Sequence, residues 1–318
     1  MVNNCKVAGR LLSSGMATQV TAGMVKELRQ LTGAPMMDCK KALQDETVTG
    51  DIAKAVDWLR AKGIAKASKN ADREAKEGVI CLMRGNDKVT LVEVNSETDF
   101  VSRNEDFQTF VASVAMTAHT ELGVGDLVID DLMGKTASAP AKEQTVKDAL
   151  IDAVNGIREN ISIKRAMSID VSGVDLVGSY VHGKVGMDAL PACVEMGSSA
   201  SVVLLSGAAD NADEVVRRLA MHTVAARPMF ATMADVPKAV RQREEEVSRS
   251  QMLEEGVGDK KPEIVEKIVA GKVNKRLGEM CLSEQVHVAE DGGPKVGKFL
   301  NKSGLKLAGF SLWTLGSS

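Results

Sequence analysis

One strand–helix pattern occurs twice along the chain, at residues 79–119 and again at residues 180–222. Each copy has strand-like sequence, a turn that contains Asp, and an amphipathic helix with a Met and a His near its end. A repeated unit of this kind is one supersecondary structure whose helix covers a sheet. The pattern therefore predicts an α+β fold with two related αβ subdomains and antiparallel sheets.

The turn of the first copy places an acidic residue beside an aromatic one, Asp99 and Phe100. A Ser102-to-Glu105 capping box is expected to open the helix that follows. That helix carries an apolar stripe at Phe107, Phe110, Val111, Val114 and Ala118. One interpretation makes Phe100 the first core contact of the helix and Asp99 a local cap; the other makes the loop functional. The second turn, at residues 207–210, lacks a Phe, so only the first copy could act through an aromatic.

Residues 21–63 predict a compact three-helix module. Its first helix ends at Gly33, after an apolar face formed by Val25, Leu28 and Leu31. Its third helix is expected to end near Gly63, and a basic linker follows at residues 64–77. Because no aromatics are interleaved with the linker's basic residues, we expect a solvated segment and not a stacking surface for single-stranded nucleic acid.

Residues 237–284 predict two charged helices joined by a glycine turn at residues 256–258, which together form an antiparallel hairpin. Strand-like sequence resumes after the hairpin, with a bulge expected at Gly309, so the hairpin is an insertion in the second αβ unit. Ile264 and Ile268, with Val265 and Val269, give its second helix a narrow apolar seam. Such a seam needs a partner, either the other helix of the hairpin or a second chain.

Composition excludes several classes of protein. The 40 Lys and Arg residues are balanced by 43 Asp and Glu residues, which argues against a bulk nucleic-acid binder. No apolar run reaches the roughly 18 residues that a membrane span needs. The five Cys residues are widely spaced, so we expect neither a disulfide framework nor a zinc site. This use of cysteine indicates a protein of a reducing compartment. The first 26 residues contain no Asp or Glu, which weakly resembles a mitochondrial transit peptide; an ordinary chain terminus is the alternative.

The chain offers no self-sufficient catalytic set, and no metal or cofactor site is expected. Of its four His residues, His119 and His222 lie on helix faces beside apolar residues, where packing is the default. His182, in a turn between strand-like runs, is the one exposed candidate. Carboxylates gather between residues 93 and 106, but no His or Cys lies among them, so we expect a solvated acidic edge.

Four segments, taken in order, carry a resemblance to a known family. They are residues 32–43 with Met36-Met37-Asp38-Cys39-Lys40, the tract Thr98-Asp99-Phe100-Val101, residues 156–165, and Gly178-Ser179-Tyr180 with His182-Gly183. With them the chain resembles translation elongation factor Ts, the nucleotide-exchange factor of elongation factor Tu, of mitochondrial or bacterial type. The resemblance extends from about residue 21 to residue 316, which is nearly the whole chain.

The resemblance implies a division of the chain into domains, including a helical module similar to ubiquitin-associated (UBA) domains and an inserted coiled-coil hairpin. The expected units are an N-terminal extension that could be a transit peptide (1–20), the UBA-like module (21–63), the basic linker (64–77), the first αβ core subdomain (78–170), the second αβ core subdomain (171–236 and 285–318), and the coiled-coil hairpin (237–284).

The resemblance also implies three contacts with Tu. The loop carrying Asp99 and Phe100 would insert near the magnesium and phosphate site of the GTPase domain, so that GDP leaves. The implied site residues are Thr98, Asp99, Phe100 and Val101 for that insertion, Met36, Met37 and Lys40 for a helix of the GTPase domain, and His182 for a more distant domain of Tu.

The function that the resemblance implies is guanine-nucleotide exchange on elongation factor Tu, without covalent catalysis. The expected partner is Tu, GDP-bound and nucleotide-free, with no direct nucleic acid, no membrane, and a homodimer through the hairpin as an option. The expected compartment is the mitochondrial matrix, with a bacterial cytoplasm or plastid as the alternative. The alternative function is a ubiquitin-like-binding adaptor or an RNA-associated protein that uses the helical module and the basic linker.

Overall fold

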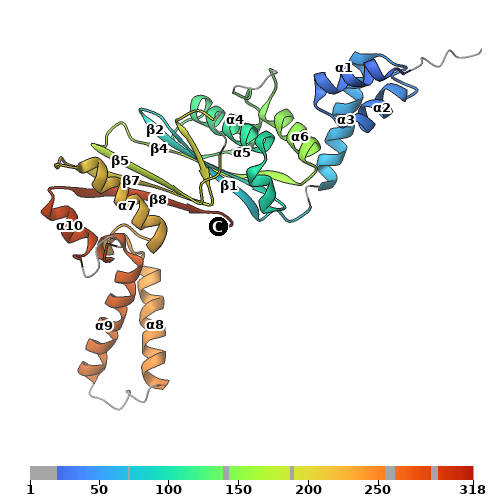
Figure 1. The fold of residues 1–318 in the computed structure, drawn as a ribbon. Helices are drawn as coiled ribbons and strands as arrows, with labels where there is room; N and C mark the ends of the chain where they lie inside the picture. Colours follow the sequence, from blue (N-terminus) through green and yellow to red (C-terminus); the bar gives the residue numbers. More distant parts are fainter. Residues whose placement is uncertain are drawn as a thin grey trace, which may run out of the picture.

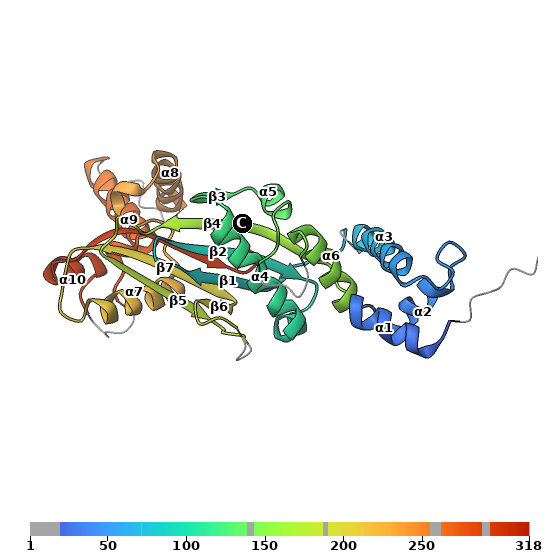
Figure 2. The same ribbon diagram turned by 90° about the horizontal axis from the view of Figure 1, so that it is seen from above.

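The computed structural model describes residues 20–70, 72–138, 143–186, 190–254, 262–287 and 293–317. The fold is α+β, as predicted: two antiparallel sheets lie between an N-terminal group of helices and a projecting helical hairpin (Figure 1). The same elongated arrangement is seen from above, with α1–α3 at one end (Figure 2). The extension expected at residues 1–20 lies outside the described residues, except for residue 20.

The N-terminal module consists of α1 (Ala22–Thr32), α2 (Met36–Gln44) and α3 (Ile52–Asn70). The Thr21 hydroxyl accepts a hydrogen bond from the Met24 amide at 3.3 Å, and Gly33 ends α1 with a φ of 67°. Its core is formed by the inner faces of the three helices and by the turn between α2 and α3, and consists of Val25, Leu28, Cys39, Ala42, Leu43, Val48 and Ala55. The expected inner position of Leu31 is wrong, because that side chain is 51% exposed.

The helix α3 does not end near Gly63 but continues to Asn70, through the first part of the expected linker. Gly63 is buried, and a Cβ there would collide with the side chain of Asn155 in α6 (Val146–Ile157). Arg60 also forms an ion pair with Asp148 of α6 at 2.7 Å. Gly63 therefore permits close helix packing, and the extra turns of α3 connect the module to the first subdomain.

The first sheet has the strand order β3-β4-β2-β1-β6. Its strands are β1 (Glu77–Arg84), β2 (Lys88–Ser96), β3 (Gly125–Leu127), β4 (Ile161–Asp170) and β6 (Val194–Gly197), and each pair is antiparallel. The helices α4 (Glu105–Glu121), α5 (Ile129–Met133) and α6 lie over one face (Figure 1). Although β6 comes from residues 171–236, it pairs with β1, because Val194 and Met196 are buried in the core of this sheet.

The second sheet has the order β5-β7-β8, with β5 (Leu176–His182), β7 (Ser199–Ser206) and β8 (Lys306–Thr314). The helices α7 (Ala212–Ala226) and α10 (Val296–Lys302) pack on it. The repeat is visible in its topology: β1-β2-α4-β4 corresponds to β5-β7-α7-β8, and in both units the last strand pairs with the middle one. The bulge expected at Gly309 is present, since the register passes from Gly309 to Leu307 and leaves Ala308 unpaired.

The two sheets pack on each other through alternating strand residues. Val79 and Cys81 of β1 face α4, whereas Ile80 and Leu82 face Val202 and other residues of the second sheet. Val203 and Leu205 on the opposite side of β7 face α7 and α10. The molecule is thus layered as helices, sheet, sheet, helices, and the inter-sheet core fixes the two repeats against each other.

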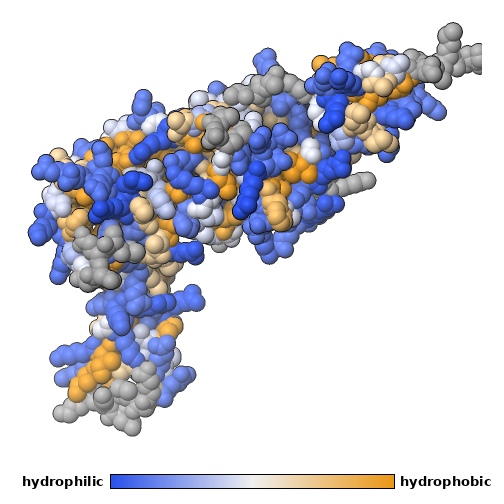
Figure 3. Space-filling model, in the orientation of Figure 1, coloured by the Kyte–Doolittle hydropathy of each residue, from blue (hydrophilic) through white to orange (hydrophobic). Residues whose placement is uncertain are grey.

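The insertion forms an antiparallel hairpin of α8 (Lys238–Glu254) and α9 (Pro262–Met280). Its buried apolar residues include Met252, Val269, Val273 and Leu277. The expected seam is partly correct: Val269 is buried and Val265 and Ile268 are half-buried, but Ile264 is 45% exposed. Figure 3 shows hydrophilic residues over most of the hairpin surface and an apolar patch near the free end of α9. The turn expected at residues 256–258 lies outside the described residues.

Short 3₁₀ turns frame the root of the hairpin, at Met233–Asp235 before it and Leu282–Glu284 after it. The Met229 and Phe230 amides both donate to the Met280 carbonyl, at 2.8 and 3.1 Å. The hairpin is therefore tied to the second subdomain by backbone bonds. Among the helices that the structure describes, none combines the length and apolar character needed to cross a membrane.

Candidate partner-binding site

The loop between β2 and α4 forms a single 3₁₀ turn, Asp99–Arg103. Phe100 is 80% exposed, whereas the next residue, Val101, is 5% exposed and belongs to the core beneath α4. Asp99 is also exposed. The interpretation of Phe100 as a core contact of the helix is therefore wrong: Val101 anchors the loop, and the aromatic ring projects into solvent.

The start of α4 differs from the predicted capping box. Asn104 is the N-cap, and its Oδ1 accepts from the Phe107 amide at 3.0 Å. The Ser102 hydroxyl donates instead to the Asp99 carbonyl at 2.6 Å, and the Ser102 carbonyl accepts from Gln108 at 2.8 Å. Because the 3₁₀ turn engages the Ser102 hydroxyl that the capping box required, Asn104 becomes the N-cap instead. The Asp99 side chain remains exposed.

Two carboxylates connect the start of the loop to the segment after α6. Glu159 accepts from the Thr98 amide at 2.9 Å and from the Thr98 hydroxyl at 2.7 Å. Glu97 accepts from the Asn160 amide at 2.6 Å and forms an ion pair with Arg73 at 3.3 Å. These contacts escaped the sequence reasoning, because Glu159 had no assigned role within residues 156–165, and its partner lies far away along the chain.

The carboxylates between residues 93 and 106 do not form one solvated edge. Glu93 is fully buried and pairs with Arg165 at 2.7 Å and with Lys164 at 3.6 Å. Glu105 and Asp106 are exposed in the first turn of α4, where their negative charges interact favourably with the helix dipole. Since these side chains point to different surroundings, they do not converge on a common ion.

The second set of candidate residues lies on α2. Met36 and Met37 are 51% and 62% exposed, and Lys40 is exposed one turn after Met36. The other side of α2 is buried through Cys39, Ala42 and Leu43. The helix thus presents two flexible apolar side chains and a cation to solvent, a combination that suits an interface more than a monomer surface.

His182 is exposed at the end of β5, just before Gly183, whose φ of 63° turns the chain. Its Nδ1 lies 3.5 Å from the Tyr180 hydroxyl, the two side chains being on the same side of the strand. The tertiary structure therefore leaves the His182 ring accessible at a strand end.

Two other histidines have packing roles, as predicted. His119 is half-buried with its Nδ1 2.9 Å from the Thr90 hydroxyl, and burial lowers its pKa. His222 is buried, 3.1 Å from Gln285, and burial also lowers its pKa, assisted by the neighbouring His287. His287 stacks on His222 with ring centroids 5.3 Å apart, a partnership that no sequence pattern indicated.

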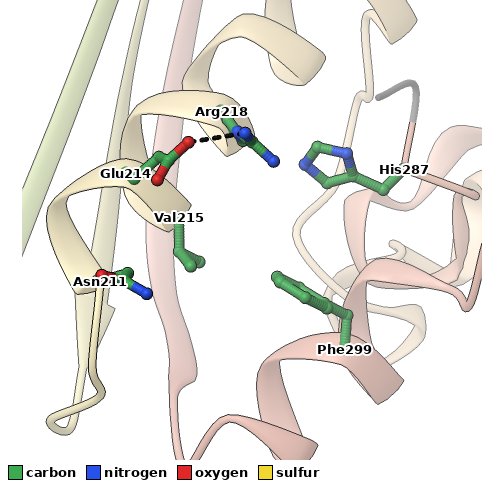
Figure 4. A pocket seen from close by; sticks show the side chains of 6 residues that line it. All are labelled: Asn211, Glu214, Val215, Arg218, His287 and Phe299. Carbon is green, nitrogen blue, oxygen red and sulfur yellow. Dashed lines mark ion pairs between the residues drawn. The ribbon is translucent and has the colours of Figure 1, made fainter. Parts of the chain in front are cut away.

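A pocket of about 230 Å³ lies beside this histidine pair, between α7 and α10 (Figure 4). It is lined by Asn211, Glu214, Val215, Arg218, His287 and Phe299. Its main charges neutralise each other, because Glu214 and Arg218 form an ion pair at 2.6 Å. None of the predicted site residues lines it, so it is distinct from the three candidate surfaces.

Comparison with known proteins identifies the family of the chain. A family described as Elongation factor TS matches residues 97–317. The chain is 40% identical over 306 residues to elongation factor Ts of Paramagnetospirillum magneticum, covering 94% of this chain and 92% of that protein. It is 41% identical to elongation factor Ts of Gluconobacter oxydans, covering 94% and 92%. It is 41% identical to that of Trichlorobacter lovleyi, covering 91% and 88%. With a match over most of its length, the chain belongs to the elongation factor Ts family.

Proposed function

We propose that this chain is a guanine-nucleotide exchange factor for elongation factor Tu in translation elongation. It acts by binding, without covalent catalysis, and the Asp99–Phe100 loop enters the magnesium and phosphate site of Tu. The observation that carries the proposal is the 80% exposure of Phe100 on a loop that is anchored on both sides. A large apolar side chain held in solvent is explained when a partner's pocket receives it.

The chemistry of the loop suits displacement of a metal-bound nucleotide. Asp99, exposed beside Phe100, would bring negative charge toward a centre whose charge balance depends on Mg²⁺ and phosphate. By linkage, tight binding of the nucleotide-free partner weakens nucleotide binding by the same factor. A coupling free energy of ~3 kcal/mol corresponds to more than a hundredfold weaker GDP binding.

Two further contacts would secure the complex. Met36, Met37 and Lys40 would pack on a helix of the GTPase domain, and His182 would contact a more distant domain of Tu; all four side chains are exposed. We also propose the domain division given above, with β6 assigned to the first sheet. A coiled-coil character and a homodimer through the hairpin remain part of the proposal.

The compartment follows the relatives, which are bacterial. They favour a bacterial cytoplasm, the alternative in the sequence analysis, over the mitochondrial matrix.

The alternative functions have less support. An adaptor that binds ubiquitin-like proteins would leave Phe100 unexplained. It would also need Trp58 in an exposed groove, whereas this ring packs against the module core and its Nε1 donates to Asp45 at 2.8 Å. An RNA-associated role for the basic residues is disfavoured, because Arg60 and Arg73 are engaged in ion pairs with carboxylates.

Release of a fluorescent GDP from the cognate Tu tests the proposal. We expect the wild-type chain to accelerate release and Phe100→Ala to lose most of the acceleration while its binding to Tu is largely kept. Because Phe100 is exposed, the substitution should change the free energy of unfolding by less than about 0.5 kcal/mol. Val128→Ala, at a 60% exposed apolar position outside the three surfaces, is the matched control. No acceleration by the wild-type chain would refute the proposal; equal rates for wild type and Phe100→Ala would refute the insertion.

A further inference from the structure

We infer that Glu159 and Glu97 are positioning residues, which hold the Asp99–Phe100 loop in the conformation that enters the partner. The inference rests on the proposed function. It concerns side chains that the sequence reasoning left without a role and that contact neither Asp99 nor Phe100 through a described hydrogen bond.

The pairing of β2 with β4 ends just before the loop. The β2–β4 ladder has its last backbone pair at Ser96 and Ile161. Beyond it, residues 97 and 98 of one segment still face residues 160 and 159 of the other, but the chains diverge toward α4 and α6. Glu159 takes the Thr98 amide, and Glu97 takes the Asn160 amide. Two side-chain carboxylates thus hold the two segments together just beyond the end of the ladder.

The hydrogen bonds that Glu159 and Glu97 accept are short and charge-assisted. Each carboxylate accepts an amide hydrogen at 2.9 Å or less, and Glu159 accepts the Thr98 hydroxyl as well, at 2.7 Å. Charge-assisted hydrogen bonds of this length are about twice as strong as neutral ones. Since Glu159 occupies both the backbone and the side chain of Thr98, it fixes the residue from which the chain turns toward Asp99.

Glu159 reaches the loop because the chain turns sharply at the end of α6. Arg158, the residue before it, caps α6 in the left-handed conformation, with a φ of 70°. A non-glycine residue rarely adopts this conformation, and here it turns the chain sharply out of α6 so that Glu159 faces Thr98. Arg73 extends the contact by pairing with Glu97 at 3.3 Å, while its carbonyl accepts from Asn160 at 2.7 Å. The segment leading out of the N-terminal module therefore joins the same network.

The consequence concerns order in the free chain. Phe100 has almost no contacts of its own, so its position depends on the residues on either side, Val101 on the core and Thr98 on Glu159. A loop that is ordered before binding loses less conformational entropy when it inserts. Removing the carboxylate should therefore loosen the loop before it affects the fold.

The test combines Glu159→Gln with Glu105→Gln. Both substitutions remove one negative charge by the same chemistry, but Glu105 is exposed on α4 and is not bonded to the loop. For Glu159→Gln we expect faster hydrogen exchange of the amides of residues 98–103 in the free chain. We also expect the maximal rate of GDP release from Tu to fall by about tenfold, with a smaller change in the half-saturating concentration of the chain. Glu105→Gln should leave both close to wild type.

The outcomes separate this inference from the proposed function. If wild type accelerates GDP release and Glu159→Gln matches Glu105→Gln in both readouts, the positioning role is refuted and the exchange function stands. If loop amides lose protection but the maximal rate is unchanged, the bonds are structural only and the inference is also refuted. If wild type fails to accelerate release, both proposals fall. Should Glu159→Gln fold poorly, judged by Trp58 and Trp313 fluorescence, Glu97→Gln is the second variant, with the same expected pattern.

Discussion

At the scale of single residues, two side chains have environments opposite to those that their chemistry favours. Phe100 is exposed although it is among the most apolar side chains of the chain, and Glu93 is buried although it is charged. In both cases the local sequence favours the other outcome. The burial of Glu93 is accommodated because Arg165, Lys164 and the Gly316 amide surround its carboxylate. Among the described residues, none offers such compensation for the exposure of Phe100, which is why we propose that it marks an interface.

A residue-scale prediction concerns backbone strain at Thr49. This exposed, β-branched residue has a φ of 50°, a conformation that disfavours any residue with a Cβ and most of all a branched one. We expect Thr49→Gly to stabilise the N-terminal module by about 1 kcal/mol, because relief of the strain outweighs the added freedom of the unfolded chain. Urea unfolding followed by Trp58 fluorescence measures the change. Thr49→Val, which keeps the branch, should give no gain; a Gly variant less stable than wild type would contradict the prediction.

At the scale of elements, sequence periodicity identifies helices better than it identifies their ends or partners. The apolar stripe predicted for α4 is fully buried, from Phe107 to Ala118. The predicted end of α3 is wrong because Gly63 lies against α6, where a small residue is needed for packing and not for termination. In α9 the buried residues are Val269, Val273 and Leu277, whereas the predicted seam residue Ile264 is exposed.

The hairpin packing can be tested with two substitutions in α9. Leu277 is fully buried, and Leu277→Ala should destabilise the hairpin by about 3 kcal/mol, through lost burial and the cavity that remains. Ile264→Ala, at a 45% exposed position, should cost less than about 1 kcal/mol. Hydrogen exchange of the α8 and α9 amides reports both changes. A larger effect at Ile264 than at Leu277 would show that the hairpin seam in solution lies near its free end.

The contact between α7 and the segment after the hairpin should depend on pH. The pKa of His222 lies below its ordinary value of 6.5, chiefly because the ring is buried and secondly because of His287. The unfolded chain therefore binds this proton more readily than the folded chain. The stability from neutral His222 is complete above pH 6.5 and is lost as the pH falls through the lower folded value. His119 contributes with the same sign, because burial lowers its pKa as well.

We accordingly expect the denaturation midpoint to be constant from pH 8 to about 7 and to fall between about pH 6.5 and 5. His222→Gln should flatten part of this dependence. A midpoint that rises on acidification over this range would contradict the assignment. The depressed pKa values of Asp148 and Asp170 affect stability only below their ordinary value of 3.8, outside this window.

At the scale of the whole molecule, the two repeats are joined by an apolar inter-sheet core and by one polar cluster. Glu93 of β2 bonds to Arg165 of β4 and to the Gly316 amide beyond β8. The Arg165 guanidinium also lies over the Trp313 ring, 4.2 Å from its centre. The buried Glu93 carboxylate thus connects two strands of the first sheet to the end of β8 in the second sheet.

Removing that carboxylate should loosen the connection between the sheets. We expect Glu93→Ala to lower the free energy of unfolding by about 3 kcal/mol, since it leaves Arg165 without its buried partner. Trp313 fluorescence during urea unfolding reports the change. Glu195→Ala, which breaks the exposed pair with Lys184, should cost less than about 1 kcal/mol. Equal effects of the two substitutions would show that the buried cluster adds nothing beyond a surface ion pair.

The elements and their repetition were predictable from the sequence: the α4 stripe, the helical hairpin, the bulge in β8 and the loop residues Asp99 and Phe100. These depend on periodicity and turn chemistry, which act between residues close along the chain. Three features became visible only in the folded molecule: β6 joins the first sheet, Glu93 is buried, and Glu159 holds Thr98. Each of these joins segments far apart in sequence, and which distant surfaces meet follows from how the layers pack together and not from any local pattern.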